Sequence, residues 1–248
     1  MHRIRLLTAL VCTSLSIAAT ASAAPVLIEN ARVFDGHEDL GVASILIDQG
    51  RIVSVGTTPS NLPTDTRRID HQGRHLLPGL ISNHAHVGNT EALEHGDRFY
   101  TRDTVVRDLR QFQRYGVTTV TALGMNSPAF HAIRTEVRDQ PLLGAQLYGA
   151  GAGIGAAAGA PPAVTMGLAN DPVARPTTAE QARAAVREQH AAGIDVVKLW
   201  VDDLGGKFPI MSPAVYRAAI DESHRLGLKV AAHIHDQKPA ADLVDAGV

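Results

Sequence analysis

The feature that most restricts the fold of this chain is an alternation of short apolar runs with helical segments, which starts at Leu80 and continues to the last residue. Such an alternation is the signature of βα units arranged around a parallel sheet. The sequence therefore predicts an α/β fold over residues 79–248. The expected strands are residues 80–86, 117–122, 145–148, 194–201 and 229–236, and the expected helices are residues 104–115, 128–137, 177–192, 212–226 and 239–245.

Five βα units are too few to close a barrel of this kind, which has eight. We expect a partial TIM (β/α)8 barrel with about five of the eight units, and three more units would need about 100 further residues. An open sheet of five strands would also leave an unpaired edge. We therefore expect this chain to be the front portion of a longer protein.

A different pattern precedes the βα units. Residues 25–78 contain short strand-like runs separated by turns, and the runs 44–47 and 51–55 flank Asp48-Gln49-Gly50, which is a hairpin signal. This pattern predicts a small β domain whose topology the residues alone leave open.

The first 24 residues are typical of a bacterial signal peptide. Arg3 and Arg5 precede an apolar run over residues 6–19, and the small residues 21–23 form a cleavage site. We expect an exported protein, periplasmic or secreted, that has no membrane segment after cleavage. Cys12, the only cysteine, would leave with the signal peptide, so the mature chain would have no disulfide.

The composition argues against a nucleic-acid partner. The net charge is −2, and aromatic residues make up only 4% of the chain, so neither a basic surface nor base-stacking side chains are expected. We expect a small-molecule substrate, and a homo-oligomer is left open.

Two histidines, His84 and His86, follow the Pro78-Gly79 turn at the end of the first expected strand. Residues i and i+2 of a strand point to the same face, so both imidazoles can reach one metal ion. Lys198 lies inside an apolar strand-like run, and His233 ends another. A lysine is rarely placed inside such a run without a partner or a function; a pairing with an aspartate at position 202 or 203 is the structural alternative.

With these residues, the chain resembles the amidohydrolase superfamily of metal-dependent hydrolases, in particular its imidazolonepropionase-like and Xaa-Pro-dipeptidase-like branch. The resemblance covers residues 26–248 and implies a small β-sandwich over residues 25–78. It implies that His84 and His86 bind metal, that a carboxylated Lys198 bridges two divalent metal ions, with zinc expected, and that His233 binds the second ion.

The implied activity is hydrolysis of a C–N bond in an amide, peptide or cyclic amide by a metal-activated hydroxide. The family also uses a histidine of a sixth strand and an aspartate after an eighth, which this chain does not contain, so we expect little or no turnover from the chain alone. The alternatives are a deaminase or lactonase of the same superfamily, and a non-catalytic truncated protein that binds metal or has a structural role.

Several other residues are weaker candidates. Ser82 stands where the family usually has an aspartate, which predicts weaker orientation of the site. His235 and Tyr148 are candidate substrate-binding residues, and Trp200 and Asp202 are further candidates for the pocket. A structural role is the more typical one for Tyr148, Trp200 and Asp202. The glycine-rich run 149–159 lacks the spacing of a nucleotide-binding motif and predicts a flexible loop.

Overall fold

The structure is a computed structural model that describes residues 23–248. The predicted signal peptide therefore lies outside the described residues, except for its last two positions. Contacts between Cα atoms divide the chain into two compact units, with the boundary between Pro78 and Gly79.

The N-terminal unit contains one five-stranded sheet in which β3, β2, β1 and β4 lie side by side and β5 also pairs with β1. The first three strands are antiparallel, whereas β4 and β5 run parallel to β1. Asp48 pairs with Arg51, so the predicted hairpin is present. The β-sandwich remains a prediction. The strands are β1 (Val26–Phe34), β2 (Asp39–Asp48), β3 (Arg51–Gly56), β4 (Arg67–Asp70) and β5 (His75–Leu76).

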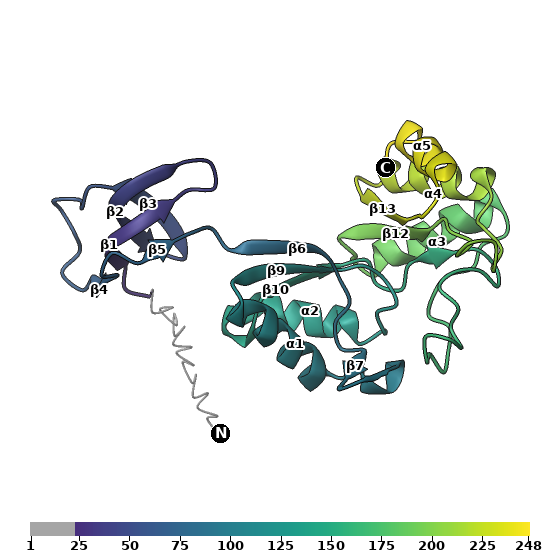
Figure 1. Cartoon of the computed structure of the whole chain (residues 1–248), viewed down its shortest axis with the longest axis horizontal. Coiled ribbons are helices and arrows are strands. Elements are labelled where there is room, and N and C mark those ends of the chain that lie inside the picture. Colours follow the sequence, from purple (N-terminus) through teal and green to yellow (C-terminus); the bar gives the residue numbers. More distant parts are fainter. Residues whose placement is uncertain (1–22) are drawn as a thin grey trace, which may run out of the picture. The chain divides into compact units, whose positions relative to one another are not determined.

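The second unit alternates strands and helices (Figure 1). A small hairpin and a 3-10 turn precede the first helix, and a second 3-10 turn precedes β10. The elements are β6 (Leu80–Ala85), β7 (Thr90–Glu91), β8 (Glu94–His95), η1 (Asp97–Phe99), α1 (Arg102–Arg114), β9 (Val117–Ala122), α2 (Phe130–Asp139), η2 (Pro141–Leu143), β10 (Gln146–Gly149), β11 (Ile154–Gly155), α3 (Ala179–Ala191), β12 (Val196–Trp200), α4 (Pro213–Arg225), β13 (Lys229–His233) and α5 (Gln237–Asp245).

The main strands of this unit form two parallel sheets, β10-β9-β6 and β11-β12-β13. Asp195 links the two sheets, because its backbone N–H donates to the Gly149 carbonyl at 3.0 Å and its carboxylate accepts from the Gly149 N–H at 2.9 Å. Arg134 and Arg138 of α2 also bind this carboxylate, at 2.9 and 2.7 Å. The fold is therefore a mixed α/β fold with parallel strands.

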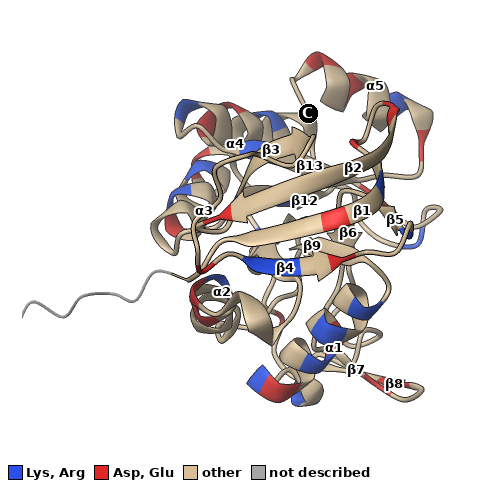
Figure 2. Ribbon diagram, turned by 90° about the vertical axis from the view of Figure 1, so that its left-hand side faces the viewer, with Lys and Arg blue, Asp and Glu red and all other residues tan. Residues whose placement is uncertain are grey.

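Helices cover the sheets through two apolar clusters. One cluster joins β12 to α3 and α4, and the other joins β6, β9 and β10 to α1 and α2. Charged residues of both signs lie along α1, α3 and α4 (Figure 2). Among the described residues, no helix combines the length and apolar character that crossing a bilayer requires.

Local sequence signals set the helix ends. The side chain of Thr178 accepts from the Gln181 N–H at the start of α3, and Thr101 and Thr104 form the same capping box at α1. The residue after the C-cap of α3 is Gly193, whose φ of 81° suits glycine.

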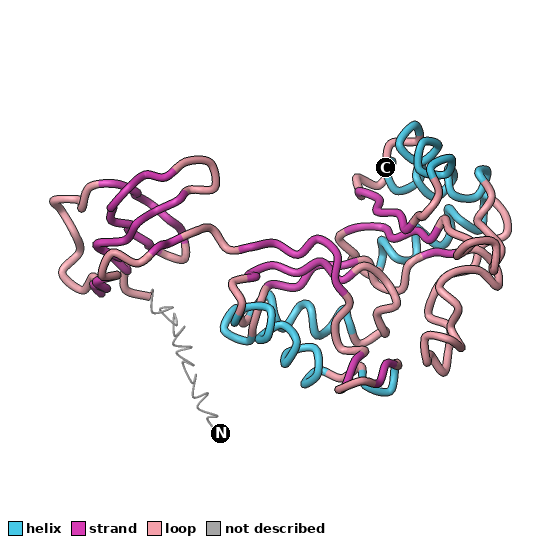
Figure 3. Tube along the Cα trace, in the orientation of Figure 1, coloured by secondary structure: helices cyan, strands magenta, loops and turns pink. Residues whose placement is uncertain are grey.

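The glycine-rich run 149–159 is not the flexible loop that its composition predicts. Ile154 and Gly155 form β11, which pairs with β12, and most of the run is buried. The irregular segment of this region lies further along, between β11 and α3 (Figure 3). There the Arg175 guanidinium donates to four backbone carbonyls, those of Ala156, Gly159, Ala160 and Pro161, and so holds the segment in one conformation.

Candidate metal centre

Strand β12 presents Lys198 and Trp200 on one face and apolar residues on the other. The intervening residues of β12 lie in the buried cluster with α3 and α4. Because successive strand residues point to opposite faces, Lys198 and Trp200 face away from these helices. In the parallel register, Lys198 lies beside Ala231 and Trp200 beside His233 of β13.

Lys198 is buried, with 1% of its surface exposed. Burial lowers the pKa of its ammonium to about 8, and no anionic partner among the described residues opposes this effect. Its Nζ atom lies 5.4 Å from the centroid of the Trp200 ring. With this pKa, Lys198 is an uncharged amine in about a tenth of the molecules at pH 7. The predicted alternative, an ion pair with an aspartate at 202 or 203, is absent from the described residues.

Two glycines allow the Trp200 ring to lie beside Lys198. A Cβ atom at Gly124 would lie 2.2 Å from the Trp200 ring, and one at Gly153 would lie 2.3 Å from it. Both glycines also have φ near +90°, which side chains rarely adopt. The backbone therefore approaches the indole at a distance that only glycine permits.

Asp202, His233 and His235 form a compact cluster at the ends of β12 and β13. One ligand atom from each lies within 4.8 Å of the others. The His233 Nε2 atom is 3.3 Å from Asp202 Oδ2, and His235 Nδ1 contacts the same oxygen. The Leu204 N–H donates to the other carboxylate oxygen at 2.6 Å. These contacts hold both imidazoles against one carboxylate.

The charge of Asp202 is retained although the residue is only 3% exposed. Burial raises the pKa of its carboxyl. Hydrogen bonds from Leu204 and His235, together with the nearby histidines, lower this pKa by more than burial raises it, so the net shift is downward. A buried carboxylate that accepts hydrogen bonds remains ionised at neutral pH. Asp202 therefore supplies a fixed negative charge.

His84 and His86 form the second pair of imidazoles. Their ring centroids are 5.6 Å apart. Ala85 and Val87 lie in the cluster with α1, so the two histidines project from the opposite face of the strand and its continuation. Burial, followed by the charge of Lys198, lowers the pKa of His84. Burial and then His84 lower the pKa of His86 to about 4.

Lys198 interacts with both groups of histidines. Its positive charge lowers the pKa of His84, of His86 and of His233, in each case after burial as the largest cause. The four residues that the sequence predicted as ligands therefore lie in one electrostatic environment. The lowered pKa values favour the uncharged form of the three imidazoles, which leaves a lone pair on each ring free to bind a metal ion.

The family model described as "Amidohydrolase family" matches residues 75–248. The chain belongs to this family. The match includes every residue of the candidate metal centre.

Two curated relatives and one solved structure illustrate how this amidohydrolase compares with known proteins. It is 37% identical over 93 residues to the exoenzymes regulatory protein AepA of Pectobacterium carotovorum subsp. carotovorum, covering 35% of this chain and 20% of the relative. It is 35% identical over 63 residues to a dihydroorotase of Syntrophus aciditrophicus, covering 25% and 15%. A Xaa-Pro dipeptidase crystallised with methionine in its active site superposes with a TM-score of 0.75 at 21% identity, covering 91% and 60%.

The chain thus spans at most a fifth of these two curated relatives and 60% of the dipeptidase structure. At 21% identity, the similarity to the dipeptidase shows a shared fold and nothing more.

Amidohydrolases use divalent metal ions, and the donor groups of this chain suit such an ion. Uncharged imidazoles and a carboxylate are ordinary ligands of divalent metals. An unmodified ammonium has no lone pair to offer, so Lys198 fits a metal site only as the free amine or in a modified, anionic form.

Asp202 is the site residue that the sequence did not assign to the metal centre. Its spacing from Lys198 and Trp200 is a period of two, which would have placed all three on one face of an extended strand.

Tyr148 has different neighbours: its ring lies 4.3 Å from the guanidinium of Arg138, and the residue is 40% exposed. Its substrate-binding role, like that of His235, remains a prediction.

Proposed function

We propose that this amidohydrolase hydrolyses a C–N bond in a small amide, peptide or cyclic amide at a metal centre formed by His84, His86, Lys198 and His233. The observation that supports the proposal most strongly is the shared environment of Lys198 and the three histidines. Perturbed titratable groups of this kind cluster at functional sites. Two zinc ions are the expected occupants.

When bound, the divalent ions supply Lewis acidity for the attacking water and the scissile carbonyl. The residues of the chain hold and orient these partners. The three histidines present neutral donors, and Asp202 fixes the ring of His233 through its contact at 3.3 Å. Because such supporting contacts keep a ligand in position, Asp202 is a positioning residue of the proposed centre.

Lys198 has the chemistry required to become a bridging ligand. Its uncharged amine can attack carbon dioxide, so that a C–N bond forms, one C–O π bond breaks and a proton is released to water. The product is a carbamate with one negative charge and two oxygen donors. The lowered pKa of Lys198 favours this reaction because only the uncharged amine is nucleophilic.

We also propose that the parallel strands of the second unit are five of the eight strands of a TIM barrel. The chain order of β6, β9, β10, β12 and β13 supports this arrangement, as does the position of the candidate ligands near the C-terminal ends of three of these strands. The smaller unit is proposed to be part of a β-sandwich.

Metal analysis of the purified 248-residue chain tests the function. We expect zinc in the wild-type chain, its loss in His84→Ala and Lys198→Ala, and its retention in His190→Ala, which changes an exposed histidine of α3. Hydrolysis of dipeptides and cyclic amides is assayed with this chain and with any longer form of it that the gene encodes. Metal binding without turnover by either form would favour the non-catalytic alternative, and absence of metal would contradict the proposal.

Deamination and ester hydrolysis are tested by adding an aminopurine and a lactone to the set of substrates. Turnover of an aminopurine or a lactone, with amides left intact, would keep the metal centre but replace the proposed substrate class.

A further inference from the structure

The segment that carries His84 and His86 is only partly fixed by the sheet. Between Ser82 and Ala85, the register of β6 against β9 shifts, so the pairing is irregular at His84. β6 ends at Ala85, and His86 lies beyond the strand. Irregular pairing of this kind changes the direction in which side chains point. Contacts from outside the sheet are therefore needed to fix the two imidazoles.

Gly88, two residues after His86, makes such a contact with α1. Its backbone N–H donates to Asp108 Oδ2 at 2.8 Å. Gly88 has φ +77°, and a Cβ atom there would lie 2.6 Å from Val105 Cγ2. The backbone therefore lies against α1 at a distance that only glycine permits.

Arg107 holds the Asp108 carboxylate in this position. Its Nε and Nη2 atoms donate to Asp108 Oδ1 at 3.0 and 2.9 Å, which leaves Oδ2 for Gly88. The Nη2 atom also donates to the Thr90 carbonyl at 2.8 Å, and Nη1 donates to the Glu91 carboxylate at 2.8 Å. One network of hydrogen bonds therefore joins α1 to the segment that follows β6.

The helix that carries Asp108 is a firm support for this network. A capping box orders the first turn of α1, and Val105, Val106 and Leu109 are buried in the apolar cluster against the sheet. The Asp108 side chain is only 24% exposed. A hydrogen bond from a backbone N–H to a carboxylate is also stronger than one between neutral groups. The contact of Asp108 with Gly88 is therefore suited to fixing the backbone near His86.

We propose that Asp108 is a positioning residue for His84 and His86, because it holds the backbone of Gly88 on α1 and so fixes where the two imidazoles project. The inference rests on the proposed metal centre, of which these histidines form one half. Ser82 gives little comparable support, since its Oγ atom is 3.5 Å from the His84 carbonyl oxygen. Loss of a contact that orients metal-binding histidines lowers metal affinity by about 10–100-fold.

Cadmium NMR of the full chain, titrated with cadmium in bicarbonate buffer, tests the proposal because each bound ion gives its own signal. We expect two signals from the wild-type chain. In Asp108→Ala, the ion beside His84 and His86 should bind about 10–100-fold more weakly, while the affinity for the ion beside His233 stays the same. Asp103→Ala, which removes an exposed carboxylate of the same helix, should leave both affinities unchanged.

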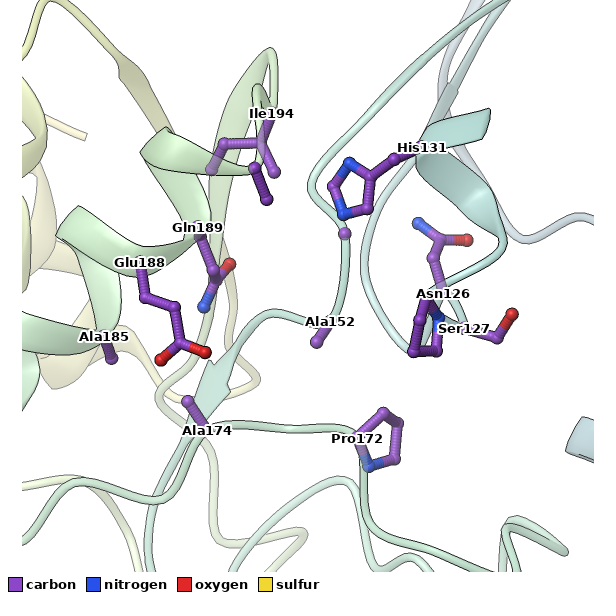
Figure 4. Close-up of a pocket in the computed structure, with 13 residues that line it drawn as sticks. Asn126, Ser127, His131, Ala152, Pro172, Ala174, Ala185, Glu188, Gln189 and Ile194 are labelled. Carbon is purple, nitrogen blue, oxygen red and sulfur yellow. The ribbon is translucent and has the colours of Figure 1, made fainter. Parts of the chain in front are cut away.

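NMR of the histidine rings in the metal-free chain separates this proposal from the proposed function. We expect Asp108→Ala to shift and broaden the ring signals of His84 and His86. The ring of His131 is the reference, because it lines a cavity between α2 and α3 that none of the four proposed metal ligands lines (Figure 4). Its signals should not change.

Asp108→Asn keeps one acceptor oxygen for the Gly88 N–H and should lie between wild type and Asp108→Ala in both experiments. This variant decides the question if Asp108→Ala fails to fold. Equal weakening of both ions, or unchanged ring signals of His84 and His86 in a folded variant, overturns the proposal. A wild-type chain that binds no ion contradicts the metal centre, whereas the ring signals still show whether Asp108 positions the two histidines.

Discussion

At the residue scale, the molecule keeps a cation in a position where burial opposes its charge. Lys198 is almost fully buried beside Trp200, and its pKa is lowered to about 8 by burial alone. The same charge lowers the pKa of three histidines. In the absence of metal, the Lys198 side chain therefore destabilises the fold, and metal binding or carboxylation would relieve that cost.

Replacement of Lys198 by methionine should stabilise the metal-free chain at pH 7 by about 3 kcal/mol. The amine has a pKa of about 8 in the folded chain and its ordinary value of 10.5 in the unfolded chain, so the charged form disfavours folding below pH 8. The cost decreases as the pH rises from 8 to 10.5. Urea unfolding of wild type and Lys198→Met in carbon-dioxide-free buffer measures the difference.

The control for this change is Lys207→Met, which alters an exposed lysine. Unfolding of wild type and Lys198→Met at the same urea concentration at pH 7 would show that burial of the charge costs nothing. A difference in stability that grows as the pH rises toward 10.5 would likewise contradict the expected effect of the Lys198 charge.

Asp202 offers a second test at this scale. Its carboxylate contacts both His233 and His235, so Asp202→Asn removes the charge that orients them. We expect zinc affinity, measured by competition with a chelating dye, to fall by about 10–100-fold. Asp203→Asn is the matched control, because among the described residues the Asp203 carboxylate accepts only from the nearby Gly206 N–H and contacts neither histidine. Equal losses in the two variants would argue against a positioning role for Asp202.

At the scale of elements, the strands place the candidate ligands, and glycines determine how closely the connecting segments approach them. Gly124, which follows β9, and Gly153, which precedes β11, both pack against Trp200 of β12. This contact fixes the indole and therefore the environment of Lys198. The close approach connects the β6-β9-β10 sheet with the β11-β12-β13 sheet near the proposed metal centre.

Gly124→Ala should be more destabilising than a glycine substitution that only strains the backbone. Gly116→Ala isolates that strain, because Gly116 has φ +82° and open space around it; it should cost about 1 kcal/mol. Gly124 has φ +90° and lies against Trp200, so a further loss of about 1–3 kcal/mol is expected from overpacking. Equal losses in urea unfolding would contradict the packing argument.

The order of the elements could be predicted from the sequence because apolar runs, capping residues and helix-ending glycines are local signals. The four candidate ligands could be selected because strand ends and the resemblance to amidohydrolases pointed to the same positions. The role of Asp202 depends on His235, which lies beyond the next strand, so its contacts arise only from the fold. Similarly, the glycine-rich run is ordered by pairing of Ile154 and Gly155 with β12, a contact that composition does not reveal.

At the scale of the whole molecule, the first residues of the chain bear on where the protein is located. We propose that residues 1–24 direct export and are removed. Expression of the chain in a bacterium should give a periplasmic or secreted product whose N-terminus, by Edman sequencing, is close to Ala24. A cytoplasmic product that retains Arg3 and Arg5 would contradict export.

The proposed function requires that His84, His86, Lys198 and His233 hold metal together. Anomalous X-ray diffraction at the zinc absorption edge, on crystals of the zinc-loaded chain grown with bicarbonate, tests it most directly. We expect two anomalous peaks, one beside His84 and His86 and one beside His233, with density for a carboxylated Lys198 between them. Zinc bound only by Asp202, His233 and His235, with His84 and His86 unliganded, would contradict it.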